Sequence, residues 1–331
     1  MSETAKVSIN VPVYNVEYYV ERCIKSILNQ TFQDFEIIVV NDATQDNSME
    51  IINKYAQIDN RIKIINKDKN EGLMAARRTG IENSEGNYIL FCDSDDYLPL
   101  NSVELLYNAA IENNADLVIG DLISELKSGV RKRVNSILPY GLKQREVMKA
   151  ILDGNCSHSL CNKIFKRELL ANVEIITFKN FTNGEDGALL YQILPFTNKI
   201  VQLKAVVYYY MANEASSTNI IFTQDKSKKW FDGMQFMYNT VRKHYGDDFN
   251  VEINKNTLYF LRHYALASGD FIFLKNEFPK LYEEINLKRA TKSYGILAGL
   301  HYYLISANIC YRTIYKTLYN SWLIFRKKLK V

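Results

Sequence analysis

Three carboxylates follow an apolar run in the first third of the chain. The run is Tyr88 to Cys92 (YILFC), and Asp93, Asp95 and Asp96 come directly after it. Carboxylates this close repel one another unless a cation neutralises them. Oxygen ligands of this kind suit Mg²⁺ or Mn²⁺, ions that usually share their coordination with substrate phosphates. The spacing therefore predicts a metal-bound diphosphate, and the alternative is that the acids only cap the helix that begins near Leu100.

A second polar pair follows another apolar run. Asn41 and Asp42 come after Phe35 to Val40 (FEIIVV), where an open α/β sheet commonly presents a polar side chain to a ribose or base. Asn-Asp after a strand is also ordinary turn chemistry, and taken alone the pair favours the turn.

The elements that must position these side chains alternate regularly. Strand patterns and helix patterns follow one another over Val7–Val13, Glu17–Leu28, Phe35–Val40, Met49–Ala56, Ile62–Ile65, Leu73–Asn83, Tyr88–Cys92, Ser102–Asn113 and Ala115–Asp121. This order predicts an α/β fold with a mostly parallel sheet flanked by helices and ligands bound beyond the carboxyl ends of the strands.

The second half of the chain has a different pattern. A strand is expected over Val201–Met211, and from about Phe222 onward the pattern is helical. We therefore predict a nucleotide-binding and catalytic domain over 1–217 and a helical C-terminal region over 218–331.

Composition narrows the classes of function. The chain has 331 residues, a net charge of +4 and 24% charged residues, which disfavours a nucleic-acid channel. Five cysteines without a CxxC pair argue against a disulfide framework and a zinc ribbon, and Cys156, His158 and Cys161 match no common zinc spacing. The polar N-terminus lacks the pattern of a signal peptide, so we expect a cytoplasmic protein.

Long stretches of the sequence resemble one known family. The run from Ser8 to Ser48 and the run from Asn70 to Leu98 look like the family 2 glycosyltransferases with the GT-A (Rossmann-like) fold, of the bacterial surface-polysaccharide type. Shorter similarities follow at Cys161–Leu170, Gly184–Asp186 and Tyr208–Thr218. The resemblance is dense over about the first hundred residues and reaches residue 218 in patches.

The resemblance implies a donor site. The residues that it places around a nucleotide sugar are Pro12, Val13, Tyr14, Asn15 and Glu17 around the nucleoside, Asp42 on the base, Arg77 toward the sugar or diphosphate, and Asp93, Ser94 and Asp95 as the DxD motif. Within that motif Asp95, with Asp93, is the expected ligand of Mn²⁺ or Mg²⁺, and Asp96 is expected to give structural support.

It also implies a reaction. Asp186 matches the family's catalytic base, Glu185 stands beside it, and Lys163 is expected on the acceptor side. A sugar hydroxyl is a poor nucleophile, so a carboxylate must accept its proton as it attacks the anomeric carbon opposite the leaving nucleotide, which inverts that centre. The alternative for Glu185 and Asp186 is a pair of acids in the first turn of a helix.

Some positions depart from the family pattern. Ala43 stands where a Gly is common, Cys161 where an aromatic is, and Met211 where an Arg often follows the tyrosines. If that Arg helps to neutralise the diphosphate, the contact must be made differently here.

The C-terminal tail combines an aromatic face with a basic end. Tyr311, Tyr315, Leu318, Trp322 and Phe325 recur at helical spacing, and Arg326, Lys327, Lys328 and Lys330 follow. This pattern is typical of a helix on an anionic membrane surface, which would make the protein peripheral on the inner face of the cytoplasmic membrane. A helix packed on the catalytic domain and a homodimer contact are the alternatives. The stretch Ser293–Tyr311 is marginal in length and weak in hydrophobicity for a membrane span, so we expect it to be buried or interfacial.

Together these observations predict one function and one rival. The prediction is an inverting, metal-dependent transfer of a sugar from a nucleotide-sugar donor, UDP-hexose or UDP-N-acetylhexosamine, to a hydroxyl of a bacterial surface glycan or lipid-linked oligosaccharide. The rival is a non-catalytic nucleotide-sugar-binding scaffold. A dehydrogenase is disfavoured because the turn after the first strand, PVYNVEYY, has no GxGxxG.

Overall fold

The computed structural model describes residues 5–125, 128–178, 181, 184–211 and 224–257. The chain divides into two compact units, one of Met1–Ile220 with Lys228–Gly246 and one of Ile221–Ser227 with Asp247–Val331. The predicted boundary between residues 217 and 218 and the whole aromatic, basic tail lie outside the described residues. Among the described residues, no helix has the length and apolar character to cross a bilayer.

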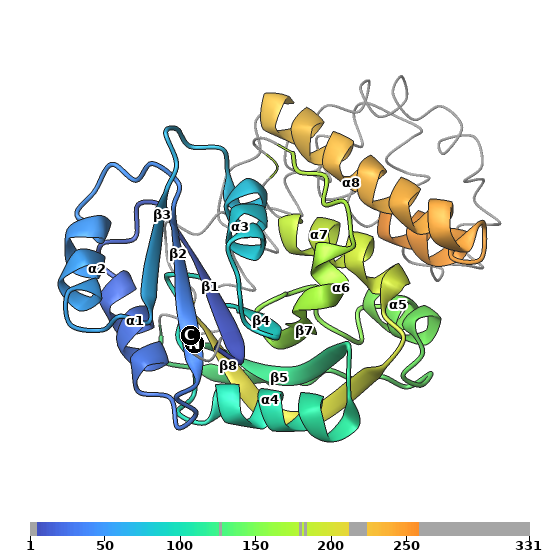
Figure 1. Cartoon of the computed structure of the whole chain (residues 1–331). Helices are drawn as coiled ribbons and strands as arrows, with labels where there is room; N and C mark the ends of the chain where they lie inside the picture. Colours follow the sequence, from blue (N-terminus) through green and yellow to red (C-terminus); the bar gives the residue numbers. More distant parts are fainter. Residues whose placement is uncertain (1–4, 126–127, 179–180, 182–183, 212–223, 258–331) are drawn as a thin grey trace. The chain divides into compact units, whose positions relative to one another are not determined.

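The first unit begins with the predicted alternation (Figure 1). Its elements are β1 (Val7–Val13), α1 (Val20–Leu28), β2 (Phe35–Asn41), α2 (Ser48–Ala56), β3 (Ile62–Asn66), α3 (Leu73–Glu82), β4 (Tyr88–Phe91) and α4 (Ser102–Asn113). These bounds confirm the predicted order of strands and helices. Strands β1 to β4 pair in parallel, in the order β3-β2-β1-β4.

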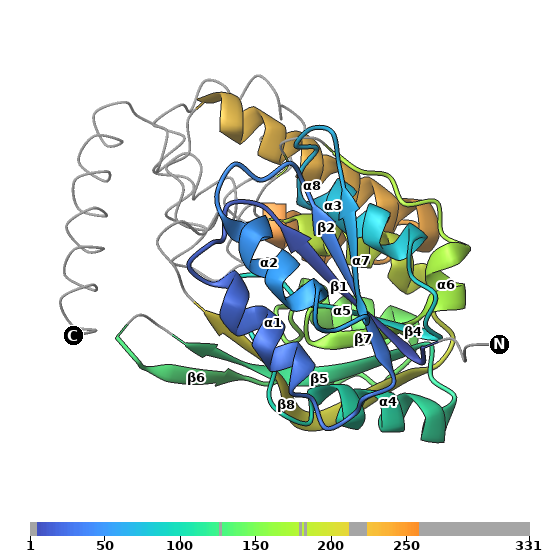
Figure 2. The same cartoon turned by 60° about the vertical axis from the view of Figure 1, so that its left-hand side comes forward.

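Both faces of this parallel part are covered. Figures 1 and 2 show α1 and α2 on one face of β1–β3 and α3 on the other. All seven residues of β1 are buried, including the polar Ser8 and Asn10, because both faces of this part of the sheet are covered. Gly80 lets α3 approach β1 closely, because a Cβ there would come within 2.8 Å of the Asn10 side chain.

The later elements change the character of the sheet. They are β5 (Leu117–Glu125), β6 (Arg131–Val134), α5 (Gln144–Leu152), β7 (Lys163–Lys166), α6 (Arg167–Ala171), α7 (Glu185–Ile193), the 3₁₀ turn η1 (Leu194–Phe196), β8 (Ile200–Met211) and α8 (Gln224–Tyr245). Strand β7 lies between β4 and β5 and is antiparallel to both, β6 is antiparallel to β5, and β8 is parallel to β5.

The pairs β2–β3, β1–β2, β1–β4 and β5–β8 are parallel and make up most of the sheet, which confirms the predicted mostly parallel sheet. The antiparallel strand β7 was not predicted, because it has four residues, KIFK, with only Ile164 and Phe165 as apolar residues. A segment this short shows no periodicity of its own. Its place between β4 and β5 is decided by pairing partners that lie far away in the sequence.

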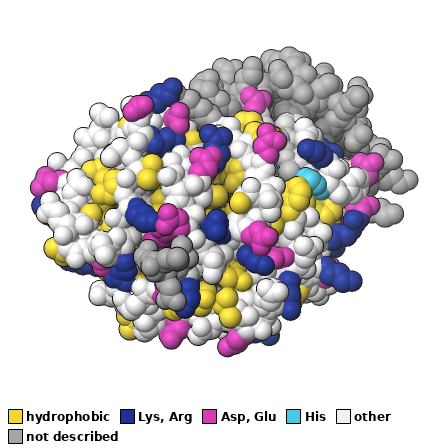
Figure 3. Space-filling view, viewed as in Figure 1, with side chains coloured by type: hydrophobic (Ala, Val, Ile, Leu, Met, Phe, Trp, Pro, Cys, Tyr) yellow, Lys and Arg dark blue, Asp and Glu magenta, His cyan; other side chains and the backbone are white. Residues whose placement is uncertain are grey.

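Surface charge is dispersed on the face seen in Figure 3. Lys and Arg side chains lie there among Asp and Glu side chains, and hydrophobic atoms form small separate patches. Within α1 and α2, ion pairs link residues one turn apart, Lys25 with Glu21 at 2.9 Å and Lys54 with Glu50 at 3.0 Å.

Candidate active site

The loops after β1 and β2 form one edge of the candidate site. Val13 and Asn41, the last residues of these strands, are paired in register, so the loops that follow lie side by side. The backbone N–H of Asn15 donates to Thr44 Oγ1 at 2.7 Å, and the Asn15 side chain accepts from the N–H of Gln45 at 3.0 Å. Of the predicted nucleoside-contacting residues, Pro12 and Val13 therefore end a strand that is fixed to its neighbour, and Tyr14 and Asn15 follow it directly.

The next residues of the two loops are joined in the same way. The N–H of Glu17 donates to Asp46 at 2.8 Å, and the N–H of Asn47 donates to the Glu17 carboxylate at 3.0 Å. Asn15 and Ala43 both have left-handed backbone angles, with φ of 53° and 57°. For Ala43 this explains why glycine is common in the family at that position, because a side chain costs free energy there.

Asp42 is buried beneath this edge. Its carboxylate accepts from the N–H groups of Glu71 at 2.9 Å and Gly72 at 2.8 Å, and Lys67 Nζ lies 3.8 Å away. Gly72 has φ of 91° and directly precedes α3. Asp42 thus fixes the start of α3, and its contact with a base stays a prediction.

The loop after β4, Asp93–Asp96 (the DSDD loop), is held by hydrogen bonds on two sides. Ser94 Oγ donates to the carbonyl of Pro12 at 2.7 Å, which ties the loop to the end of β1. The Asp96 carboxylate is buried and accepts from Tyr208 Oη and the N–H of Met211, both at 2.7 Å. This confirms the structural support expected of Asp96. Burial, with the charges of Asp95 and Asp93, raises the pKa of Asp96 well above its usual range.

The candidate base lies close to this loop. Arg77, from α3, donates from Nη2 to Asp93 at 2.8 Å and from Nη1 to Asp186, in the first turn of α7. The Arg77 side chain is wholly buried, whereas those of Asp93 and Asp186 are 25% and 23% exposed. The structure thus brings Asp93 and Asp186 to one guanidinium and places Arg77 beneath them, where the sequence predicted a side chain toward the donor.

Asp186 has a second contact, and Glu185 lies beside it. The other Asp186 oxygen accepts from the N–H of Leu160 at 3.2 Å, and Glu185 accepts from the N–H of Gly184 at 2.8 Å. Burial and the neighbouring Asp186 charge raise the pKa of Glu185. Both acids occupy the first turn of α7, so the helix-terminus interpretation holds for their position and is compatible with a catalytic role.

Lys163 does not face an acceptor in this structure. Its side chain is wholly buried, and Nζ donates to the carbonyls of Ser157 at 2.9 Å and Ser159 at 2.5 Å and to Asn162 Oδ1 at 2.9 Å. An ammonium has three hydrogens, so these acceptors use all of them. The expected acceptor contact is therefore corrected: Lys163 holds the 157–162 turn, which carries Leu160.

A partly buried histidine supports the same region. His158 Nε2 lies 2.9 Å from Tyr191 Oη on α7. Burial, with the charge of Lys163, lowers the pKa of His158 to about 4. The sequence did not predict that the site carboxylates and their loops are supported by His158, Tyr191, Tyr208 and the Leu160 N–H. Each of these contacts joins residues more than 25 positions apart, and no local pattern indicates such a partner.

The carboxylates after β4 fit a cation whose coordination is shared with phosphates. Among the described residues, no group of three or more His, Cys, Asp or Glu side chains is arranged as a metal cage. Mg²⁺ and Mn²⁺ at phosphate sites commonly take one or two carboxylates and complete their shell with phosphates and water. Asp95 and Asp93, both partly exposed after β4, can supply such ligands.

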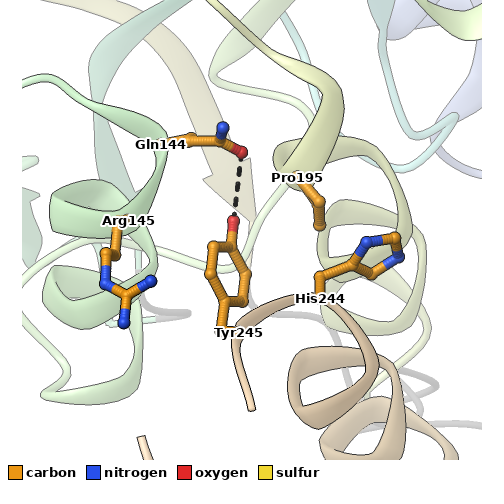
Figure 4. Close-up of a pocket in the computed structure, with 5 residues that line it drawn as sticks. All are labelled: Gln144, Arg145, Pro195, His244 and Tyr245. Carbon is orange, nitrogen blue, oxygen red and sulfur yellow. Dashed lines mark hydrogen bonds between the residues drawn. The ribbon is translucent and has the colours of Figure 1, made fainter. Parts of the chain in front are cut away.

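A separate cavity lies away from these carboxylates. It measures about 230 Å³ and is lined by Gln144, Arg145, Pro195, His244 and Tyr245 (Figure 4). The Tyr245 hydroxyl points to the Gln144 side chain, 3.3 Å away, from the opposite wall. None of the predicted site residues lines this cavity, so we place the candidate active site at the strand ends instead.

Comparison with known proteins identifies the family of this chain. The family model described as glycosyl transferase family 2 matches residues 8–173, a span that holds β1–β4 and their loops. The chain belongs to glycosyltransferase family 2. Its fold is accordingly the GT-A fold of that family.

Similar proteins are bacterial glycosyltransferases. Glycosyltransferase GlyA of Streptococcus pneumoniae is 33% identical over 65% of this chain, which spans 32% of that protein's length. Poly(ribitol-phosphate) beta-N-acetylglucosaminyltransferase TarP of Staphylococcus aureus is 30% identical over 72% of this chain and 72% of TarP.

Solved structures share the architecture. Residues 1–349 of S. aureus TarS superpose with a TM-score of 0.69 at 18% identity, covering 96% of this chain and 92% of that one. The same TarS fragment in complex with UDP-GlcNAc gives a TM-score of 0.65 at 20% identity. At this level of identity, the similarity to TarS establishes the fold of this family 2 glycosyltransferase and not its substrate.

Proposed function

We propose that this glycosyltransferase moves a sugar from a nucleotide-sugar donor to a hydroxyl of a bacterial surface glycan or lipid-linked oligosaccharide, with inversion at the anomeric carbon. The observation that carries the proposal is the convergence of Asp93 and Asp186 on Arg77. It puts a candidate base beside the strand ends where α/β sheets bind nucleotides.

The donor is a UDP-hexose or UDP-N-acetylhexosamine. TarP, which is 30% identical, is named for transfer of N-acetylglucosamine, and the TarS fragment of the same fold was crystallised with UDP-GlcNAc. The polar loops after β1 and β2 offer backbone and side-chain hydrogen-bonding groups to a nucleoside. The acceptor class is inferred from the same relatives.

The chemistry follows from the position of the carboxylates. Asp186 accepts the proton of the acceptor hydroxyl as the oxygen attacks the anomeric carbon. Glu185, with its raised pKa, orients the acceptor or the base beside it. Asp95 and Asp93 would hold a divalent cation, which would supply positive charge for the departing diphosphate. Asp42 and Ser94 keep the surrounding loops fixed during these steps.

The proposal is tested by nucleotide release. The purified chain is mixed with Mn²⁺ and a panel of UDP- and GDP-sugars, and wild type is compared with Asp186→Asn and Asp95→Asn. We expect metal-dependent release from one donor, slowed about 100-fold or more by either substitution. The matched control is Asp34→Asn, because Asp34 precedes β2 at the opposite end of the strand and pairs with Lys6 at 3.2 Å.

The outcomes separate the proposal from its rival. Release that depends on Asp186 and on Mn²⁺, with Asp34→Asn at the wild-type rate, supports a transferase. Tight binding of a nucleotide sugar without any release, with or without lipid-linked acceptors, would replace the transferase by a non-catalytic scaffold.

A further inference from the structure

Arg77 is buried in a position that a donor cannot reach. Its side chain has no exposed surface, although it stands on α3, beside the candidate site. Its two outer nitrogens serve carboxylates that lie 16 and 109 residues away along the chain. The guanidinium therefore joins the DSDD loop to α7 from below.

The partners of Arg77 account for its charge. Burial opposes that charge, but Asp186 and Asp93 outweigh burial and raise the pKa of Arg77 well above its usual value. Cys161 and Glu185 also face it. An arginine whose charge is satisfied by two carboxylates has no need of a phosphate to compensate its burial.

The geometry of the Arg77 guanidinium fork, formed by Nη1 and Nη2, matters as well as its charge. A guanidinium is planar and presents N–H groups at a fixed separation, whereas a lysine presents a point charge. Because Nη1 and Nη2 hold different carboxylates, the fork sets the distance between Asp93 and Asp186. The Leu160 N–H, at 3.2 Å, fixes the second Asp186 oxygen, so the carboxylate cannot turn freely.

We propose that Arg77 is a positioning residue, which sets the spacing between the base Asp186 and the donor-side carboxylate Asp93 and acts through them instead of binding the donor. This inference rests on the proposed function. A base abstracts a proton only within hydrogen-bond distance of the attacking hydroxyl, and a displacement of about 1 Å can cost about 100-fold in rate.

A double-mutant cycle in the full chain tests this role. The kcat and the KM for the sugar donor are measured for wild type, Arg77→Gln, Asp186→Asn and the double variant. Each assay contains Mn²⁺ and the donor from which wild type releases nucleotide fastest. We expect Arg77→Gln to lower kcat about 100-fold in wild type and less than about threefold in the Asp186→Asn background. The KM for donor should change less than kcat.

Two further variants serve as a control and as a test of the guanidinium geometry. Arg78→Gln is the matched control, because Arg78 is the neighbouring arginine, is 43% exposed and contacts Glu82 one turn away. It should stay within twofold of wild type. Arg77→Lys keeps the buried charge but loses the fork, so we expect kcat to fall at least about tenfold. If Arg77→Gln fails to fold, the cycle is run with Arg77→Lys.

Three results would overturn the inference. These are a kcat within threefold of wild type for Arg77→Lys, an equal loss from the Arg77 substitution with and without Asp186, or a rise in KM with kcat unchanged. The last would make Arg77 a donor-binding residue. A wild-type rate for Asp186→Asn would instead refute the proposed function, since the base itself would then be misassigned.

Discussion

The two sides of the candidate site are held by different kinds of interaction. The loops after β1 and β2 are joined by short hydrogen bonds between partly exposed groups, such as Asn15 N–H to Thr44 at 2.7 Å. The side that carries Asp186 is held by the buried cations Arg77 and Lys163 and by the partly buried His158. Exposed bonds compete with water, whereas an unpaired buried charge has no alternative partner. The comparison teaches that substitutions on the base side should cost more than substitutions on the nucleoside side.

The largest expected effect comes from Lys163. Lys163→Met leaves one buried and two partly buried acceptors without their donor, so the free energy of unfolding should fall by about 3 kcal/mol, measured by chemical denaturation. kcat should fall as the turn that carries Leu160 loosens, with little change in the KM for donor. Lys166→Met, in the same strand but half exposed and 3.8 Å from Glu168, is the control and should cost under about 1 kcal/mol. Equal effects of the two substitutions would remove the distinction between the two sides.

The next effect is a pH dependence through His158. Its pKa is lowered from 6.5 to about 4 in the folded chain, so between these values the unfolded chain binds more protons. Stability is therefore lost as the pH falls from about 6.5 toward 4. Between pH 7.5 and pH 4.5, wild type should lose about 2 kcal/mol more than His158→Gln, which keeps a polar partner for Tyr191. Parallel pH profiles of the two proteins would show that His158 titrates normally.

A smaller effect is expected on the nucleoside side. Thr44→Val keeps the shape of the side chain but removes a hydroxyl that contacts Asn15 N–H at 2.7 Å and Asp46 at 2.8 Å. Stability should fall by about 1 kcal/mol. The KM for donor should rise while kcat changes little, the reverse of Lys163→Met. A loss of kcat at unchanged KM would contradict the assignment of this edge to the nucleoside.

The smallest effect should be a gain. Ala43 has φ of 57°, a conformation that glycine adopts without steric cost. Ala43→Gly should raise the free energy of unfolding by about 0.5 kcal/mol, because relief of strain exceeds the added entropy of the unfolded chain. Thermal unfolding gives the sign directly, and a decrease would mean that the neighbouring loops relieve the strain already.

Much of the fold and of the candidate site could be predicted because the signals are local. Strands β2 and β4 are buried and largely apolar, and β1 and β3 combine β-branched residues with clear turns at their ends. Since the carboxyl ends of parallel strands share one edge of a sheet, the sequence also predicted that ligands bind at that edge, where Asp42 and the Asp93–Asp95 segment follow their strands. Strand β7 escaped prediction because its pairing with β4 and β5 is not encoded in its own four residues.

The sequence by itself determined which side chains are available for chemistry and which strand ends carry them. Only the tertiary structure decided what each charged side chain does there. The sequence placed Arg77 toward the donor and Lys163 on the acceptor side, yet both are wholly buried, one beneath two carboxylates and the other within a turn. The reason is physical: the free energy of a buried charge depends on partners from distant segments, and only folding brings those partners together.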